Sequence, residues 1–370
     1  MKRTYTYQVL EGSAKEVGRK EAEYLKTAKP EIARVYAAPF EGKTERLEEG
    51  EKLLEMNERW CPGLNEEIEG FAEELDVQPE SVFYYTGSIP RTGNCSQFAA
   101  LPDRAGGRTL CARSYEWTYD DELTLMTTRI TGRAAHTGFT VMCFGRLDGI
   151  NERGLWVSMT ATNPNPEGRI PDTVGFRFWS LIRTILDRAG SVEEAVALAE
   201  PFPLAFHIAL LVADQYGNAA LIEKAPDSQA VRRFTTGIVV STNHYTAPEM
   251  KPLNSQVFTH STKRYDFLRK SLRDGKITPE RIQTILAGSF PNGLSCHYYR
   301  EYFGTLWSSY ADPATGTLTV CFGPADIAEN VYRTFGLTDP VGTTPFTAEL
   351  PDEKAGSGMW DRIPNGTPRP

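Results

Sequence analysis

The sequence predicts an α+β fold in which two antiparallel sheets stack face to face, with helices on their outer faces. From Cys95 onward, groups of strand-like segments alternate with groups of helical segments. The links between neighbouring strands are short and rich in turn residues, as in Asp148–Gly154, and such links favour antiparallel pairing. The first 94 residues are acidic and helical in pattern, so we expect a helical segment ahead of the sheets.

Three helices are predicted in the first 94 residues. Ser13 and Glu16 have the spacing of a capping box, which predicts a helix ending near Lys26. Residues 44–58 predict a second, charged helix, and Pro62 is expected as the first residue of a third. Apolar residues of this third helix recur at helical spacing and should share one face: Leu64, Ile68, Phe71, Ala72 and Leu75. We expect the whole segment to act as a lid or scaffold for the sheets.

The rest of the chain predicts strands with helices between them. Strands are expected at 109–113, 139–144, 155–160, 208–213, 219–223, 237–241, 305–311 and 317–322. Helices are expected at 175–188, from 191, at 263–273 and at 279–287. Because no internal repeat or linker is visible, we expect one domain, divided into a helical segment (1–94), a sheet core (95–349) and a flexible tail rich in proline and glycine (350–370).

Composition excludes several classes of function. The net charge of -8 over 370 residues argues against nucleic acid or an anionic membrane surface as a partner. No apolar run could cross a membrane and no secretory signal is visible, so a cytoplasmic location is expected. The six cysteines are scattered without a C-x-x-C pair, which predicts reduced thiols. Phosphate-binding and dinucleotide-binding motifs and metal-ligand spacings are absent, so neither a cofactor nor a metal is expected.

Cys95 is the candidate nucleophile, because a cysteine sulfur attacks carbonyl groups strongly once it has lost its proton. Gly93 can adopt strained backbone conformations, and a tight turn there would let the Cys95 thiol attack the carbonyl of Asn94. Hydrolysis after this N-to-S acyl shift would cut the chain between Asn94 and Cys95. The freed α-amino group, with a pKa of about 8, could then serve as the base for the thiol. The alternative is a buried structural cysteine.

Seven separated segments together resemble one family: 95–98, 110–117, 149–155, 213–223, 241–245, 261–264 and 321–324. In this order they resemble the N-terminal nucleophile hydrolases of the isopenicillin-N acyltransferase group. Choloylglycine hydrolases, penicillin V acylases and acid ceramidase are more distant relatives. The resemblance spans residues 8 to 330 and implies a four-layer αββα sandwich with a cysteine nucleophile.

The resemblance implies roles for residues around the proposed cut. Cys95 matches the nucleophile, and Arg113 matches an arginine near its sulfur, where a cation would lower the thiol pKa. Glu116 stands where the family usually has an aspartate that contacts the amino group of the nucleophile. A salt bridge between Arg113 and Glu116 is the alternative interpretation. Asn94 is a departure, because relatives that process themselves often have a smaller residue before the cut.

Three further positions complete the expected site. Asn243 matches an asparagine whose amide donates to the oxyanion, although a turn-forming asparagine is the alternative. The second oxyanion donor is expected near Asn163. Arg264 matches a second arginine close to the site, and the alternative is a solvated residue on the first turn of a helix.

Taken together, these features predict an amidase or acyltransferase that cleaves a linear C–N amide bond through a thioester on Cys95. The expected substrate is a small-molecule N-acyl amide, and the acyl acceptor is water or an amine. Two alternatives stay open: an uncut hydrolase that pairs Cys95 with a histidine such as His244, and an inactive relative that keeps the fold as a binding or scaffold protein. The sequence predicts neither the acyl group nor the oligomeric state.

Overall fold

The computed structural model describes residues 1–37, 44–82, 94–119, 124–141, 144–162, 175–254, 256–356 and 358–364. Its larger sheet runs in the order β11 (Ser228–Phe234), β10 (Ala219–Ala225), β9 (Ile208–Asp214), β8 (Leu155–Ala161), β7 (Asp148–Asn151), β5 (His136–Val141), β4 (Thr124–Ile130), β1 (Lys2–Gly12) and β18 (Gly342–Glu349). The short β6 (Gly145–Arg146) pairs with β5.

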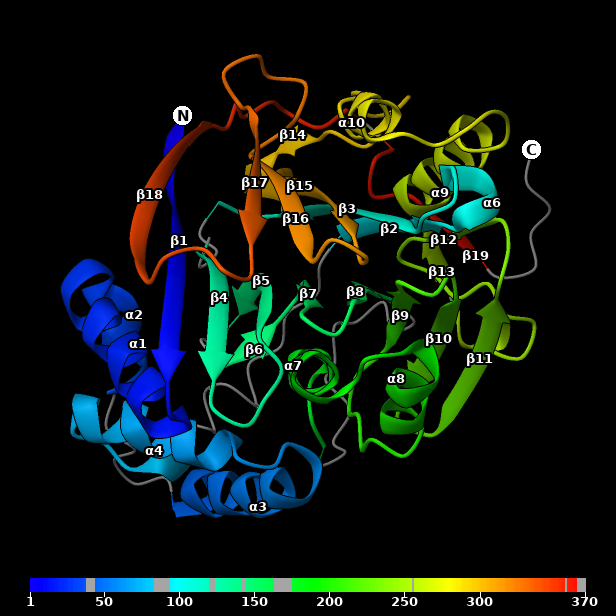
Figure 1. Cartoon of the computed structure of the whole chain (residues 1–370). Helices are drawn as coiled ribbons and strands as arrows, with labels where there is room; N and C mark the ends of the chain where they lie inside the picture. The colour runs from blue at the N-terminus through cyan, green and yellow to red at the C-terminus, as the bar shows by residue number, and fades with distance from the viewer. Residues whose placement is uncertain are drawn as a thin grey trace.

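The smaller sheet lies against the larger one (Figure 1). Its order is β12 (Ile238–Ser241), β2 (Asn94–Ala100), β3 (Leu110–Trp117), β15 (Phe303–Asp312), β16 (Thr317–Phe322) and β17 (Tyr332–Gly336), and β14 (His297–Tyr298) pairs with β15. A separate pair joins β13 (Gln256–Phe258) to β19 (Arg362–Pro364). The two sheets meet closely where β2 packs against β8.

Helices cover the outer face of each sheet. α7 (Phe178–Arg188) and α8 (Val192–Ala199) pack on the larger sheet, whereas α9 (Thr259–Ser271) and α10 (Pro279–Leu286) pack on the smaller one. The short α6 (Pro102–Ala105) follows β2. The layers are therefore α, β, β, α, which confirms the predicted fold class.

The helices of the first 94 residues gather beside the β1 side of the larger sheet (Figure 1). They are α1 (Ala14–Ala28), α2 (Pro30–Tyr36), α3 (Thr44–Trp60) and α4 (Leu64–Leu75). α1 and α4 cross with their backbones almost in contact, since a Cβ atom built on Gly18 would lie 1.8 Å from the Glu67 carbonyl oxygen. Glycine is therefore required for this close approach.

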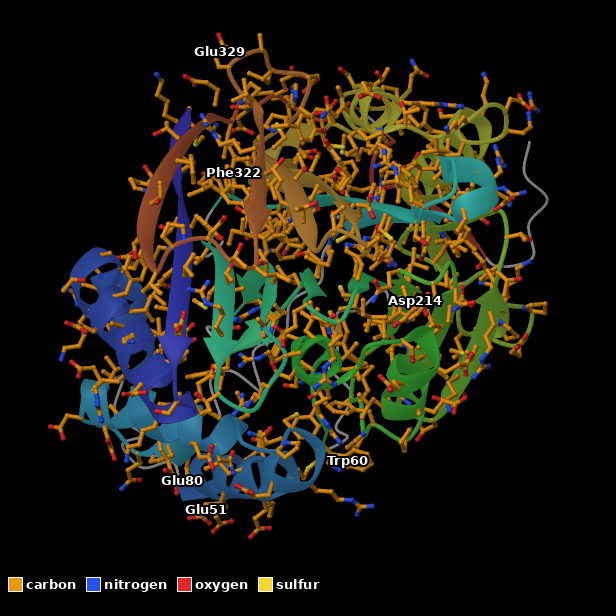
Figure 2. The ribbon with its side chains drawn as sticks, in the orientation of Figure 1. Glu51, Trp60, Glu80, Asp214, Phe322 and Glu329 are labelled. Carbon is orange, nitrogen blue, oxygen red and sulfur yellow. The ribbon has the colours of Figure 1, made fainter. Side chains whose placement is uncertain are left out.

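Aromatic side chains fill much of the space between the sheets. The Trp307 ring stacks between Tyr115, at 4.1 Å between centroids, and Phe139, at 3.7 Å. Figure 2 shows Phe322 within the packed interior, whereas Glu51 and Glu329 lie at the periphery. Tyr115 lies opposite Cys95 in the smaller sheet, so this stack packs beside Cys95 on the face that points toward the larger sheet.

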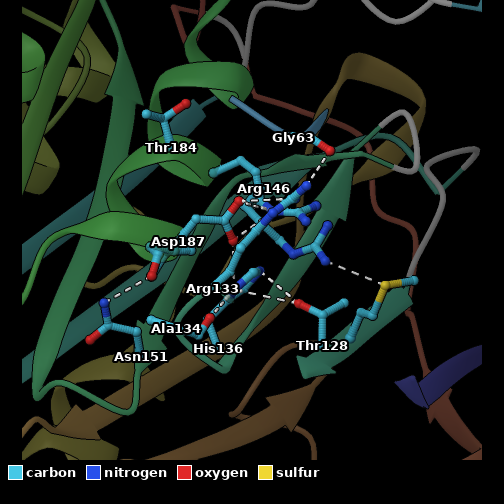
Figure 3. A network of polar contacts seen from close by, with 12 residues as sticks. Gly63, Thr128, Arg133, Ala134, His136, Arg146, Asn151, Thr184 and Asp187 are labelled. Carbon is cyan, nitrogen blue, oxygen red and sulfur yellow. Dashed lines mark hydrogen bonds and ion pairs between the residues drawn. The ribbon is translucent and has the colours of Figure 1, made fainter. Parts of the chain in front are cut away.

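A buried network of charged groups ties α4 to α7 and to the larger sheet (Figure 3). Both carboxylate oxygens of Glu67 accept hydrogen bonds from Arg183, at 3.1 and 2.8 Å. Arg183 Nε also lies 3.0 Å from each carboxylate oxygen of Asp187, and His136 Nδ1 lies 3.3 Å from Asp187 Oδ1. Burial raises the pKa of Glu67, but Arg183, with smaller contributions from Arg133 and Arg146, more than offsets burial and holds this pKa below its ordinary value.

Most predicted elements are confirmed with small shifts at their ends. The capping box of Ser13 and Glu16 is present, and Thr278 caps α10 with Pro279 as its first residue. The prediction for Pro62 is wrong, because Gly63 adopts a left-handed conformation (φ 81) as the N-cap and α4 begins at Leu64. The division of the chain at residues 94 and 349 stays a prediction.

Several strands were not predicted from the sequence. β1 alternates threonine and tyrosine from Thr4 to Tyr7, a pattern typical of strands, yet it lies within the segment expected to be helical. It runs parallel to β4, so this pair departs from the expected antiparallel sheets. β4, β11, β17 and β18 were also missed, and β19 forms within the segment 350–370 that was expected to be a flexible tail. No helix of the described ranges is long and apolar enough to cross a membrane.

Candidate active site

Cys95 lies at the start of β2, between β12 and β3, and only 1% of it is exposed. In the antiparallel pair of β2 and β3, Cys95 stands opposite Tyr115, and Asn94 stands opposite Glu116. Side chains alternate along a strand, so Cys95 and Arg113 share the face that points toward the larger sheet. Glu116 belongs to the opposite face, which α9 covers.

The buried side chain of Arg113 contacts the Cys95 sulfur. Its Nη2 lies 3.4 Å from Cys95 Sγ, while Nη1 donates to Ser158 Oγ at 3.0 Å and to the Leu147 carbonyl oxygen. Its Nε lies 3.5 Å from Asp148 Oδ2. The structure therefore pairs Arg113 with Asp148 rather than with Glu116. Asp148 and Ser158 are site residues that sequence reasoning missed, since Asp148 was interpreted only as part of a hairpin.

The pKa of the Cys95 thiol is raised to about 11. Burial is the largest cause, and Arg113 only partly offsets it by stabilising the thiolate. Arg113 acts on the thiol pKa in the expected direction, but burial outweighs it and the pKa stays above its ordinary value. At neutral pH the thiol is protonated, so a nucleophilic role requires a nearby base.

Asn243 contacts the backbone nitrogen of Cys95, and Arg264 contacts its carbonyl oxygen. Asn243 follows β12, and its Oδ1 accepts from Cys95 N at 3.0 Å and from Arg264 Nη2 at 2.7 Å. Arg264, on α9, donates through Nη1 to the Cys95 carbonyl oxygen at 2.6 Å and to Ser96 Oγ at 2.9 Å. Arg264 is fully buried, so the alternative of a solvated arginine is wrong.

The amide nitrogen of Asn243 points away from Cys95. Its Nδ2 donates to the carbonyl oxygen of Ala161 at 2.8 Å, at the end of β8. The atom that would stabilise an oxyanion is therefore engaged in the uncut chain. Asn163, the expected second donor, lies outside the described residues.

Glu116 is buried on the helix side of the smaller sheet. It accepts hydrogen bonds from Ser114 Oγ and, at 3.4 Å, from Thr305 Oγ1. Burial raises its pKa to about 7, although Arg264 and the Ser114 hydroxyl both act to lower it. The peptide nitrogen of Cys95 donates to Asn243. The contact of Glu116 with the freed amino group of Cys95, implied by the resemblance, stays a prediction.

Glu116→Gln should remove a pH dependence of stability. The pKa of Glu116 in the folded protein is about 7, above its ordinary 4.5, so the native state retains a proton that the unfolded state has released. Stability from this group is thus present at low pH and is lost as pH rises from 4.5 through 7, by about 3 kcal/mol. Urea unfolding from pH 4.5 to about 8 should show the variant gaining stability relative to wild type. If the unfolding free energies of the two proteins changed in parallel with pH, the raised pKa of Glu116 would be contradicted.

The histidines do not form a Cys–His pair in the described part of the chain. His244 Nδ1 lies 2.9 Å from Ser261 Oγ and 3.2 Å from Thr242 Oγ1. The side-chain hydrogen bond that reaches Cys95 Sγ from a described residue comes from Arg113. Within the same ranges, no group of His, Cys, Asp and Glu side chains is arranged to hold a metal ion.

The sequence profile of the acyl-coenzyme A:6-aminopenicillanic acid acyltransferase family matches residues 107–326, more than half of the chain. The chain belongs to this family. Membership confirms the resemblance drawn from the motifs and makes the protein an amidohydrolase or acyltransferase. Arg113, Glu116, Asn243 and Arg264 lie inside the segment matched by the acyltransferase family, whereas Cys95 lies twelve residues before it.

Solved structures similar to this acyltransferase-family protein have low sequence identity. A penicillin V acylase from Agrobacterium tumefaciens is 14% identical, with 68% of this chain and 90% of that one covered, at a TM-score of 0.45. A mutant conjugated bile acid hydrolase from Clostridium perfringens is 13% identical, with 70% and 99% covered, at 0.42. A Caenorhabditis elegans N-acylethanolamine-hydrolyzing acid amidase ortholog is 16% identical, with 59% and 93% covered, at 0.40. No curated protein sequence matches the chain.

Proposed function

We propose that this protein is a self-processing cysteine amidase or acyltransferase that cleaves a linear C–N amide bond through a thioester on Cys95. One observation carries the proposal: the sulfur, the nitrogen and the carbonyl oxygen of Cys95 are each contacted by a different buried polar side chain. These side chains are Arg113, Asn243 and Arg264, respectively. A cysteine with a purely structural role has no need of three such partners.

Self-cleavage would use the peptide bond between Asn94 and Cys95. The Asn94 side chain donates to the Tyr302 carbonyl oxygen at 3.0 Å, which anchors the residue before this bond. The Cys95 sulfur attacks the Asn94 carbonyl carbon, the C–N bond breaks, and the nitrogen takes the thiol proton to become an amine. Water then hydrolyses the thioester, which leaves a carboxylate on Asn94 and a free thiol on Cys95.

Turnover would repeat this chemistry on a small-molecule N-acyl amide. The new α-amino group of Cys95, with a pKa of about 8, takes the thiol proton and passes it to the leaving amine. Arg113 stabilises the thiolate, and the Nδ2 group of Asn243 exchanges the Ala161 carbonyl for the oxyanion, with a second N–H from the region of Asn163. Water or an acceptor amine then releases the acyl group. The family is named for transfer to 6-aminopenicillanic acid, which favours an amine as one possible acceptor.

The test is the intact mass of the purified protein under denaturing conditions, beside Cys95→Ala. Wild type should give two fragments that join between Asn94 and Cys95, and the variant should stay at full length. Cys111→Ala removes another buried cysteine from the neighbouring strand and should be cut like wild type. A full-length wild type that hydrolyses N-acyl amides would refute self-processing and support an uncut enzyme. A full-length wild type without activity would support a binding protein.

A further inference from the structure

We infer that His260 is a positioning residue that holds the Arg264 guanidinium in place and, through it, Asn243 and the backbone of Cys95. The inference rests on the proposed role of Cys95 as the nucleophile. His260 and Arg264 lie four residues apart on α9, so both side chains project from the same face of the helix. Both are fully buried, and His260 Nδ1 lies 3.0 Å from Arg264 Nη2.

The contact with Arg264 determines which nitrogen of the His260 ring carries the proton. A guanidinium has only donors, so Nδ1 of His260 must be the acceptor and the ring proton must lie on Nε2. Burial and the Arg264 charge both lower the pKa of His260 well below its ordinary value. His260 therefore stays neutral across the physiological range and keeps its acceptor.

The surroundings of His260 are those of an apolar side chain. Its ring stacks on Phe258 at 5.1 Å between centroids and contacts Phe303 at 4.5 Å and Trp360 at 5.3 Å. Within the described residues, the buried Nε2 atom has no hydrogen-bond partner. A leucine would suit these neighbours and would bury no unpartnered N–H. Unlike histidine, leucine would provide no hydrogen-bond acceptor for Arg264.

His260 supplies one of the acceptors that orient Arg264. The Nε of Arg264 also has no hydrogen-bond partner in the described part of the chain, so the hydrogen bonds that orient the guanidinium come from the two Nη groups, while its Cζ lies 5.3 Å from the centroid of the Phe303 ring. Nη2 is shared between His260 and the Oδ1 atom of Asn243, and Nη1 reaches the Cys95 carbonyl. Without His260, Nη2 keeps Asn243 as its acceptor among the described residues, and the contacts of Nη1 with the Cys95 carbonyl and Ser96 Oγ have to position the rest of the guanidinium. We expect the guanidinium to shift, which would displace the Asn243 amide relative to the Cys95 backbone.

Three variants separate the role of His260 as an acceptor from its role in packing. His260→Leu should lower the rates of self-cleavage and amide turnover by about 10-fold to 100-fold, without lowering the thermal midpoint. His260→Asn places an amide oxygen near the position of Nδ1 and should recover most of the lost rate. Phe258→Leu trims the aromatic packing without touching Arg264, so it should lower the thermal midpoint and leave the rates unchanged.

A spectroscopic measurement tests the same inference without any activity. In protein labelled with nitrogen-15 histidine, His260 should show protonated Nε2 and bare Nδ1, unchanged between about pH 5.5 and 8. Protonation on Nδ1, or titration in this range, would overturn the inference. So would wild-type rates in His260→Leu, or failure of His260→Asn to recover activity. If wild type neither cuts itself nor turns over amides, the proposed function fails, and the tautomer alone decides the role of His260.

Discussion

Replacing Cys95 with alanine is expected to lower amide turnover by about 10⁴-fold or more, because a nucleophile and its base act as one catalytic unit. The same change removes the sulfur that would attack Asn94, so the variant should also keep its chain uncut. The measurement is the release of free amine from a panel of N-acyl amides. The folded structure should tolerate the change, since a buried thiol and a methyl group differ by one heavy atom.

Two companion variants make this result specific. Cys111→Ala also removes a thiol from a fully buried position, on the adjacent strand β3, and should turn over amides at the wild-type rate. Cys95→Ser keeps a weaker nucleophile and should be impaired, because the hydroxyl proton is much harder to remove than the thiol proton. Wild-type turnover by Cys95→Ser would contradict the assignment of Cys95.

Elements built from local pattern were predictable from the sequence. Thr278 and Pro279 give the start of α10 because a side-chain cap and a fixed φ act within one turn. β1 was missed because its pairing partners, β4 and β18, are far away in the chain, and a helical pattern follows immediately. Tertiary contacts of this kind are not contained in a local window of sequence.

In the candidate site, too, features encoded by local motifs were predictable, and those that depend on the whole fold were not. Motif order placed Cys95, Arg113, Asn243 and Arg264 in one expected site, and the structure brings these four together. The pKa-lowering effect of the nearby cation could be inferred from a motif, but the larger effect of burial could not, because burial is a property of the whole fold. His260 was beyond sequence reasoning, since its contact with Arg264 gains meaning only from what Arg264 touches.

Glu67→Gln is expected to destabilise the fold by about 3–5 kcal/mol, because it removes a buried carboxylate and leaves the Arg183 charge with less compensation. Both Glu67 and Arg183 have side chains only 1% exposed, so water cannot replace the lost partner. The amide of glutamine keeps one acceptor oxygen where the carboxylate has two, and it buries two N–H donors beside a guanidinium. Urea unfolding at constant pH measures the change.

The matched control for this pair is an exposed one in the same helix. Glu73 of α4 pairs with Lys15 of α1, and its side chain is 53% exposed. Glu73→Gln should therefore leave the unfolding free energy unchanged within error, since solvent screens such a pair. Arg183→Met in the Glu67→Gln background should lose less stability than the sum of the two single changes, because the unpaired charge is gone. Equal losses of unfolding free energy in Glu67→Gln and Glu73→Gln would contradict a stabilising buried salt bridge between Glu67 and Arg183. The larger loss in Glu67→Gln would establish that α4 is held to α7 by charge as well as by apolar contact.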